Sequence, residues 1–424
     1  MENTFSRVAP GIWRATLQLV DKETISNPKG KPLPELMDYE FEEVSGGELP
    51  FNFEVKYSGD STVFVEIING KERIEVRDVR IWKDKNASND SIEIAFPLYD
   101  SYIRAGFEER VMSGLWTVNN RDAYYAIPFT ARFGQSHRFT TLKKEPVIDF
   151  GGKWDVDFGI DGDDPWPAIG HFEQNGNELT GTFTTETGDY RYLGGTVQAN
   201  KIYLSCFDGS HAFLFEAKYN PDSTLIGSFR SGKHYKTIWE GKRNADAKLK
   251  SPNDLTFLKE GYDKISFAFE NPEGKIISTD DESLKGKVKV YQILGTWCPN
   301  CRDETEFLTN YLQKNNNENL EVIALAFEKH KDKKKANAAI RKYKNSFQMP
   351  YEMVLAGPSN KKEAAKALPM LNHILSYPTL IFVDKNDKVR KIHTGFYGPA
   401  TEEYESFTKE FDRTVQELLV EEAG

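Results

Sequence analysis

The sequence predicts a multidomain protein with an all-β N-terminal region, an antiparallel barrel or sandwich, and an α/β C-terminal domain. Its 424 residues exceed what one typical hydrophobic core holds, so two to three domains are expected. Short runs of alternating apolar and polar residues fill residues 1–245, which is typical of β-strands. After residue 262 strands alternate with long helical patterns, which indicates an α/β layer.

The first β series has strand patterns bounded by Gly, Asn and Asp residues, as expected for antiparallel sheet with one solvated face. Its strands are FNFEVKY (51–57), TVFVEII (62–68), RIEVRDVRIW (73–82), SIEIAF (91–96) and AYYAIPFTARF (123–133). We assign this module to residues 1–145.

A second β module is predicted for residues 146–245, and its short spacing favours a barrel or sandwich over sheets joined by helices. The two modules resemble each other. GIWRATL near residue 11 parallels GKWDVDF near 152, SIEIAFPLYDSY near 91 parallels KIYLSCFDGSHA near 201, and VMSGLW near 111 parallels TLIGSF near 224. This suggests a duplicated β module.

A polar segment, residues 246–262, is predicted to link the β region to a C-terminal domain at 263–424. The domain should alternate strands and helices in the order KVKVYQIL, CRDETEFLTNYLQKN, EVIALAF, KKANAAIRKYKNSF, YEMVLAG, KKEAAKALPML, TLIFVDK, VRKIHTG and EEYESFTKEFDRTVQELL. Such alternation indicates an α/β layer with at least some parallel strands.

Charge and hydropathy exclude several classes of partner. Residues 246–424 carry 27 Lys+Arg and 28 Asp+Glu (net -1), which leaves 28 and 37 (net -9) for residues 1–245. An acidic half disfavours nucleic acid, because phosphate binding needs a basic face. No apolar stretch approaches the roughly 20 residues of a transmembrane helix, and the start MENTFSRVAPGIWRATL shows no export signal.

Two of the three cysteines, Cys298 and Cys301, fall between a buried strand pattern and a helix in LGTWCPNCRDETEF. Leu308 and Leu312 continue the helical spacing, and Pro299 suits the first helical turn. Cys298 should therefore lie at a helix N-terminus, where N–H groups and the dipole stabilise a thiolate and lower its pKa.

The spacing also allows half of a metal site or a chance pair. Zinc needs four ligands, but there is no second cysteine pair, and His330 and His373 lack the spacing of a zinc finger. We therefore expect no metal and no cofactor. Cys206, on a strand face with Ile202 and Leu204, is expected to be a small buried side chain.

GTWCPNC after KVKVYQIL, followed some 80 residues later by SYPTLIFVDKNDKVRKIHTGF, resembles the TlpA-like thiol-disulfide oxidoreductases over about residues 255–420. The resemblance implies a thioredoxin fold. Cys298 then corresponds to the nucleophile and Cys301 to the resolving thiol, and together they form the redox-active disulfide. The resemblance also makes Pro378 the cis-proline. The implied substrate-binding residues are Trp297, Pro299, Asn300, Tyr377 and Pro378.

Two positions depart from related patterns. Thioredoxin has a buried carboxylate six residues before the nucleophile, whereas this chain has Gln292. Glu328, at the end of EVIALAFE, is the catalytic candidate for proton transfer, and the alternative is a solvated residue at a loop start. A peroxidase would need Thr or Ser and a proline where this chain has Gly295 and Tyr291, so a peroxidase is disfavoured.

The expected function is dithiol–disulfide exchange with protein thiols or disulfides, as a protein disulfide reductase in cell redox homeostasis. It would need a membrane or soluble electron donor. The alternative is a ligand- or partner-binding β-barrel with an accessory redox domain. The resemblance implies an extracytoplasmic location, periplasmic or envelope-anchored, with a cytoplasmic location as the alternative.

Overall fold

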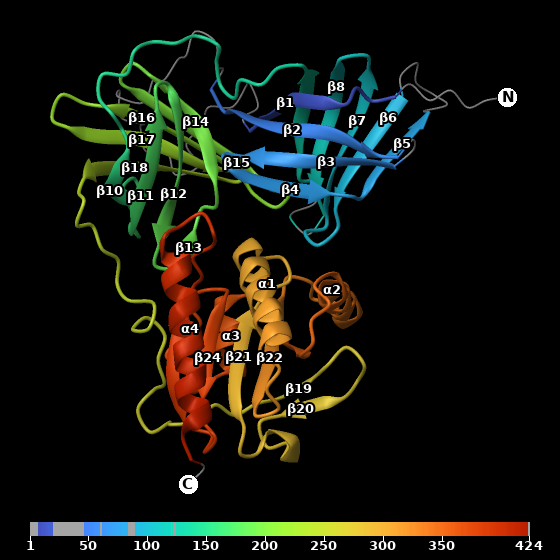
Figure 1. The fold of residues 1–424 in the computed structure, drawn as a ribbon, viewed down its shortest axis with the longest axis vertical. Helices are drawn as coiled ribbons and strands as arrows, with labels where there is room; N and C mark the ends of the chain where they lie inside the picture. The colour runs from blue at the N-terminus through green and yellow to red at the C-terminus, as the bar shows by residue number, and fades with distance from the viewer. Residues whose placement is uncertain are drawn as a thin grey trace. The chain divides into compact units, whose positions relative to one another are not determined.

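The computed structural model describes residues 7–19, 46–59, 62–83, 90–119, 121 and 124–422. Residues 1–6, part of the stretch without a visible export signal, lie outside these ranges. The chain forms two compact units, each described here by itself (Figure 1). The first comprises residues 1–183 and 190–248, and the second comprises 249–424 together with the short segment 184–189.

The first β module is an open, half-barrel sheet of nine antiparallel strands in the order β4-β3-β2-β1-β9-β8-β7-β6-β5. Its strands are β1 (Gly11–Gln18), β2 (Glu48–Ser58), β3 (Thr62–Asn69), β4 (Glu72–Val76), β5 (Val79–Lys83), β6 (Asp90–Phe96), β7 (Ser101–Glu108), β8 (Val111–Val118) and β9 (Ala126–Phe133). Alternate residues are buried in most of them, as the sequence pattern predicts.

The second β module is an eight-stranded barrel. Its order is β11-β10-β18-β17-β16-β15-β14-β12, the pairing of β11 with β12 closes it, and β13 extends from β12. Its strands are β10 (Gly152–Phe158), β11 (Trp166–Asn175), β12 (Glu178–Thr185), β13 (Gly188–Asp189), β14 (Leu193–Gln198), β15 (Lys201–Phe207), β16 (Ala212–Tyr219), β17 (Thr224–Ser231) and β18 (Tyr235–Arg243). The predicted all-β region is confirmed.

The aromatic side chains of the second module fill its barrel. Phe158, Phe183 and Phe215 pack with their ring centroids 4.7–6.0 Å apart, and Phe229 and Trp239 complete the same cluster. Cys206 is fully buried among them, as expected of a small core residue. This packing leaves the interior of the barrel occupied by the protein's own side chains.

The outer face of the barrel completes the core of the half-barrel within the same unit. Phe207 on β15 stacks on Phe51 with ring centroids 4.3 Å apart and meets Trp116 edge-on at 5.1 Å. Asn69 on β3 donates to the Phe207 carbonyl at 2.8 Å. The open sheet therefore buries its concave apolar face against its neighbour.

The two modules share an unusual local feature at their first strands. Trp13 and Trp154 are both fully buried, and each indole Nε1–H donates to the carbonyl four residues earlier, on Ala9 and Phe150, at 3.0 and 2.9 Å. In each module the first strand pairs with the second and the ninth, and strands nine to five follow in the same order. These correspondences are what a duplication would produce.

The second unit contains a mixed seven-stranded sheet in the order β20-β19-β23-β22-β21-β24-β25, in which β21, β22 and β23 are parallel. The strands are β19 (Ala268–Glu270), β20 (Ile276–Ser278), β21 (Val288–Leu294), β22 (Leu320–Glu328), β23 (Glu352–Pro358), β24 (Thr379–Val383) and β25 (Val389–Thr394). The helices are α1 (Pro299–Lys314), α2 (Lys333–Ser346), α3 (Lys361–Ala367) and α4 (Glu403–Val420), with a 3₁₀ turn at Glu282–Leu284. The predicted α/β thioredoxin-like domain is confirmed.

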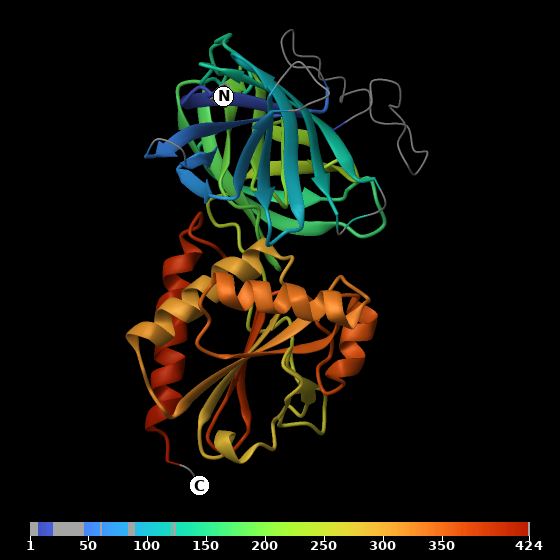
Figure 2. The same cartoon turned by 90° about the vertical axis from the view of Figure 1, so that its right-hand side faces the viewer.

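Helices cover both faces of this sheet (Figure 2). On β21, Tyr291 and Ile293 belong to the core cluster that includes Ala364 of α3, whereas Gln292 points to the opposite face and contacts α1. Helices α1 and α4 pack together, and Tyr311 donates to Asp412 at 2.8 Å. Among the described residues, no helix is long and apolar enough to span a membrane.

Most of the predicted linker packs on the second unit. Lys259 N–H donates to the Met370 carbonyl at 2.8 Å, and Thr394 N–H donates to the Pro252 carbonyl at 2.9 Å. Residues 249–262 therefore belong to this unit.

Candidate active site

The cysteine pair lies where β21 delivers the chain to α1. All seven residues of β21 are buried, and Cys298 is the N-cap of α1, with Pro299 at the first helical position. Proline costs nothing there, because the first helical N–H groups have no partner within the helix. The expected strand–cysteine–helix arrangement is thus confirmed.

The Cys298 sulfur lies among hydrogen-bonding groups. Cys298 as a whole residue is 7% exposed. Cys301 N–H donates to Cys298 Sγ at 3.4 Å. The Cys298 thiol in turn donates to the Tyr377 carbonyl, also at 3.4 Å. Burial opposes ionisation, but hydrogen bonds from the Cys301 thiol and from the Cys301 and Asn300 N–H groups, together with the Lys329 charge, lower the pKa of Cys298 overall. Cys298 therefore has the character of a nucleophile.

Cys301 has the opposite character. It is fully buried, and burial together with its neighbour Cys298 raises its pKa well above the ordinary thiol value. Both cysteines are free thiols in this structure. A thiol of lowered pKa that keeps a small exposed fraction, beside a fully buried thiol of raised pKa, is the asymmetry that ordered thiol–disulfide exchange requires.

Two aromatic residues and a proline flank the pair. Trp297 donates through Nε1 to the Phe327 carbonyl at 3.0 Å, and its ring centroid lies 5.6 Å from that of Tyr377. The Tyr377–Pro378 peptide bond is cis. Lys329 Nζ lies 4.4 Å above the Trp297 ring. The structure thus brings the substrate-binding residues implied by the resemblance to the immediate surroundings of Cys298.

Glu328, at the end of β22, is 2% exposed rather than solvated. Its carboxylate accepts from Thr296 N–H at 3.0 Å and from Thr296 Oγ1 at 2.9 Å. Burial outweighs these bonds and raises the pKa of Glu328 to about 7. This carboxyl group therefore changes protonation near neutral pH, and its hydrogen-bond partner Thr296 lies two residues before the nucleophile along the chain.

A second buried carboxyl group, Glu304, was missed from the sequence. It lies one turn after Cys301, is fully buried, and accepts from Gln292 Nε2 at 2.9 Å, while its Oε1 has no hydrogen-bond partner. Burial raises its pKa well above the usual glutamate value. Gln292 also receives a hydrogen bond from Tyr351 at 3.2 Å. Thioredoxin has a buried carboxyl group at the position of Gln292. Here a buried carboxyl group contacts Gln292 from the facing helix α1, through Glu304.

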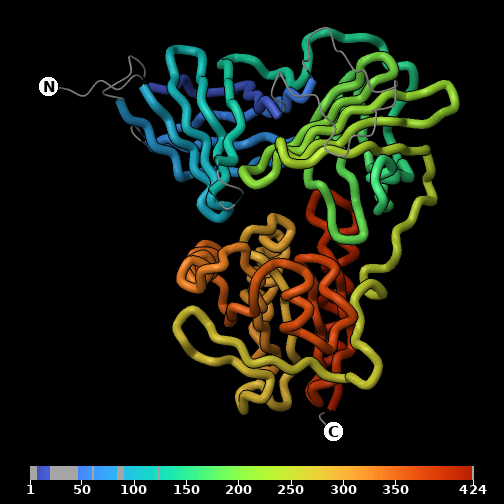
Figure 3. Tube along the Cα trace, turned by 180° about the vertical axis from the view of Figure 1, so that it is seen from behind, coloured from blue at the N-terminus to red at the C-terminus, as the bar shows by residue number. Residues whose placement is uncertain are grey.

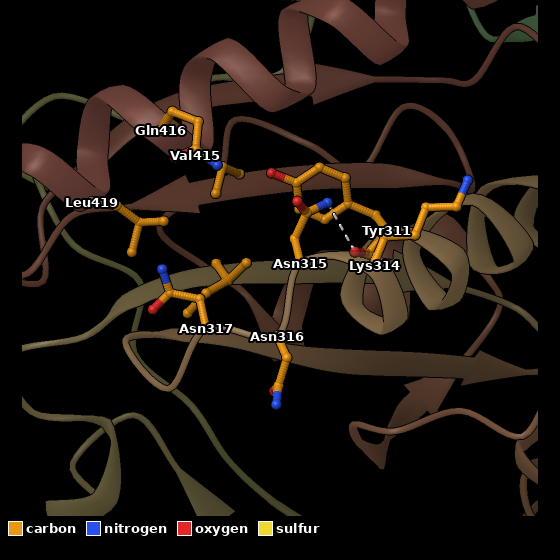
Figure 4. A pocket seen from close by; sticks show the side chains of 9 residues that line it. Tyr311, Lys314, Asn315, Asn316, Asn317, Val415, Gln416 and Leu419 are labelled. Carbon is orange, nitrogen blue, oxygen red and sulfur yellow. Dashed lines mark hydrogen bonds between the residues drawn. The ribbon is translucent and has the colours of Figure 1, made fainter.

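A surface pocket of about 240 Å³ in this unit lies at the far end of α1 from the cysteines (Figure 4). Its lining includes Tyr311, Lys314 and Asn315 of α1 and its C-cap, and Val415, Gln416 and Leu419 of α4. It has no part in the redox site. Within the described ranges, no three His, Cys, Asp or Glu side chains gather as a metal site would require.

Comparison with known proteins identifies the second unit. Residues 261–392 match the model of the AhpC/TSA family. The C-terminal domain is a redoxin domain. Thiol-disulfide oxidoreductase ResA of Bacillus subtilis is 26% identical over 138 residues, 32% of this chain and 69% of ResA. ResA of Halalkalibacterium halodurans is 21% identical over 142 residues, 34% of this chain and 72% of that protein.

Among solved structures, a thioredoxin-family thiol:disulfide interchange protein from Chlorobium tepidum aligns with 38% of this chain and 98% of its own length, at 20% identity and a TM-score of 0.29. The two ResA proteins are thiol-disulfide oxidoreductases by name, and the redoxin domain that is similar to them carries a close Cys298–Cys301 pair.

Proposed function

We propose that the protein exchanges dithiol for disulfide with protein substrates and works as a reductant. The observation that carries this proposal is the asymmetric pair at the start of α1, in which Cys298 has a lowered pKa and Cys301 a raised one. ResA, named a thiol-disulfide oxidoreductase, supports the same reaction class.

The reaction follows from this asymmetry. The Cys298 thiolate attacks one sulfur of a substrate disulfide, forming a mixed disulfide and releasing one substrate thiolate. Cys301 then loses its proton and attacks Cys298 Sγ, which releases the second substrate thiol and leaves a Cys298–Cys301 disulfide. Two electrons pass to the substrate. A dithiol donor, membrane-bound or soluble, must reduce the pair again.

We assign proton transfer from Cys301 to a buried carboxyl group, with Glu328 as the candidate because its pKa of about 7 lets it be ionised at neutral pH. Burial also raises the pKa of Glu304 well above the usual glutamate value, which makes it the second carboxyl group to test. Glu328→Gln should slow release of the mixed disulfide and remove an inflection near pH 7 from its pH profile. If the inflection near pH 7 were lost in Glu304→Gln and kept in Glu328→Gln, Glu304 would be the residue that accepts the proton.

The reductant direction is supported by the kind of groups that stabilise the Cys298 thiolate. Neutral N–H and S–H donors and one lysine stabilise it. A strong oxidant needs a much more stabilised reduced form.

The β region is proposed to dock or space a partner rather than to hold a small ligand. Aromatic rings of residues such as Phe215 and Trp239 occupy the barrel interior, where a ligand cavity would have to lie. We further propose an extracytoplasmic location, which the TlpA-like resemblance implies, with a cytoplasmic one as the alternative. Cell fractionation decides between them.

The exchange activity is tested by insulin reduction in the presence of a dithiol. We expect Cys298→Ser to abolish catalysis and Cys301→Ser to trap a mixed disulfide, while Cys206→Ala, which removes the buried barrel cysteine, leaves the rate unchanged. Full activity of Cys298→Ser would refute the proposal.

A further inference from the structure

The segment Thr184–Asp189 lies against the redox site although both of its neighbours along the chain, Phe183 and Tyr190, belong to the β unit. It comprises the last two residues of β12, the two-residue turn that follows, and β13, and its sequence is TTETGD. Figures 1 and 3 both show this green turn beside the red chain that precedes α4.

Three backbone carbonyls of the segment, at alternate positions, accept hydrogen bonds from side chains of the redoxin domain. Tyr397 donates to the Thr185 carbonyl at 3.0 Å, and Ser376 donates to the Thr187 carbonyl at 2.9 Å. Asn300 donates to the Asp189 carbonyl at 3.3 Å. Backbone acceptors are common to all peptides, so these donors recognise a main chain rather than particular side chains.

Two of the three donors are neighbours of redox-site residues along the chain. Asn300 lies between the two cysteines, and Ser376 precedes Tyr377, whose carbonyl faces Cys298 Sγ. Gly398 N–H binds the Asp189 carboxylate at 2.8 Å. Asn300 and Ser376 thus anchor the segment directly beside residues on which disulfide exchange would depend.

Two glycines let the backbones approach closely. A Cβ on Gly395 would lie 2.8 Å from the Thr187 carbonyl carbon, and Gly395 N–H itself donates to the Pro378 carbonyl at 2.9 Å. A Cβ on Gly188 would lie 2.3 Å from Asn300 Nδ2 and 3.0 Å from the Phe396 carbonyl. The segment therefore fits these loops without intervening side chains.

We propose that Thr184–Asp189 is a built-in occupant of the surface on which a protein substrate must lie, and that it moves away when such a substrate binds. This inference rests on the proposed exchange activity. The segment contains no cysteine, so it competes with substrate without being oxidised or reduced. A small disulfide reaches Cys298 without needing this surface, so the segment would discriminate by substrate size.

The test compares Gly188→Ala with Gly176→Ala. Both glycines have positive φ, +138° and +59°, but a Cβ on Gly176, in the turn between β11 and β12, meets no atom within 4 Å. Weakened docking should raise kcat/KM for insulin roughly three- to tenfold in Gly188→Ala, since less of the protein is in the occupied form. Gly176→Ala should match the unchanged protein, and hydroxyethyl disulfide should react equally in all three.

A second pair probes the carboxylate anchor. Asp189→Ala removes the acceptor for Gly398 N–H, whereas Asp189→Asn keeps an acceptor oxygen. We expect faster hydrogen exchange at Gly398 and faster insulin reduction only in Asp189→Ala. The inference would be overturned if the rates with insulin and with hydroxyethyl disulfide changed in parallel. It would also be overturned if Gly398 exchanged faster while the rate of insulin reduction stayed constant or fell. An unchanged protein that reduces neither disulfide would instead refute the proposed function, and the inference with it.

Discussion

Glu304 and Glu328 are two buried carboxyl groups beside a cysteine pair, and their environments differ. Glu328 has hydrogen bonds from Thr296 to both carboxylate oxygens, whereas one oxygen of Glu304 has no partner. Hydrogen bonds to the charged form favour ionisation, and burial opposes it. The balance leaves Glu328 with a pKa of about 7, and burial raises the pKa of Glu304 well above the usual glutamate value.

The burial of Glu328 makes stability depend on pH. Its folded-state pKa of about 7 lies above the unfolded value of 4.5, so its contribution is complete below pH 4.5 and is lost as the pH rises through 7. As the pH rises from 4 to 8, the unchanged protein should therefore lose about 3 kcal/mol of its free energy of unfolding relative to Glu328→Gln, which has no carboxyl group to ionise at this position. Urea unfolding at several pH values measures it, with exposed Glu306→Gln as control. A constant difference would contradict the burial.

The Cys298 thiolate should form below the pH of an ordinary cysteine. The rate of iodoacetamide alkylation should accordingly rise with a midpoint under the free-thiol pKa of about 8.5. Peptide mapping should place the fast label on Cys298 and leave Cys301 slow, because Cys301 is buried and its pKa is raised. Equal labelling of both, or a fast phase that survives in Cys298→Ser, would contradict the asymmetry.

The sequence identified the residues that carry a motif and missed those that depend on a facing element. Cys298, Cys301 and Pro299 are predictable because local spacing determines an N-cap. Glu304 was predictable in principle, since it falls three residues after Cys301 and four before Leu308, on the buried face of α1. The contacts of Thr184–Asp189 were not, because no local pattern reports a contact more than 100 residues away.

At the scale of elements, the turn from β21 into α1 depends on Gly295. A Cβ there would lie 2.4 Å from Trp297 Nε1, and that ring is held by its hydrogen bond to Phe327. Gly295→Ala should lower the free energy of unfolding by about 1–3 kcal/mol and displace Trp297, which its fluorescence would report. Gly46→Ala, with no atom within 4 Å of its Cβ, is the matched control. Equal stabilities of the two variants would contradict this packing.

The alternating patterns predicted most strands but not their partners. RIEVRDVRIW reads as one run, yet it forms β4 and β5, which lie at opposite edges of the nine-stranded sheet. Residue Val79, directly after the break, pairs with Ile94 of β6. A period of two shows which face is buried and not which strand lies alongside, so the sequence could not reveal this division.

At the scale of the whole molecule, two compact units predict two unfolding transitions, because each unit has its own core. Trp154→Phe removes a buried hydrogen bond in the β unit, and Val290→Ala removes buried methyl groups in the redoxin domain. Each substitution should lower the free energy of unfolding of its own unit by about 2 kcal/mol. Calorimetry should then show one transition at a lower temperature and the other unchanged. A single transition that both variants lower would contradict independent units.

We propose that Cys298 and Cys301 form a reversible, reducing dithiol. The most direct test equilibrates the protein in graded thiol buffers and measures the fraction of oxidised pair, with Cys298→Ser as control. We predict reversible titration at a potential nearer thioredoxin's, about -270 mV, than the oxidant DsbA's, about -120 mV. A value near -120 mV would make the protein an oxidant, and a pair that does not titrate would contradict the account.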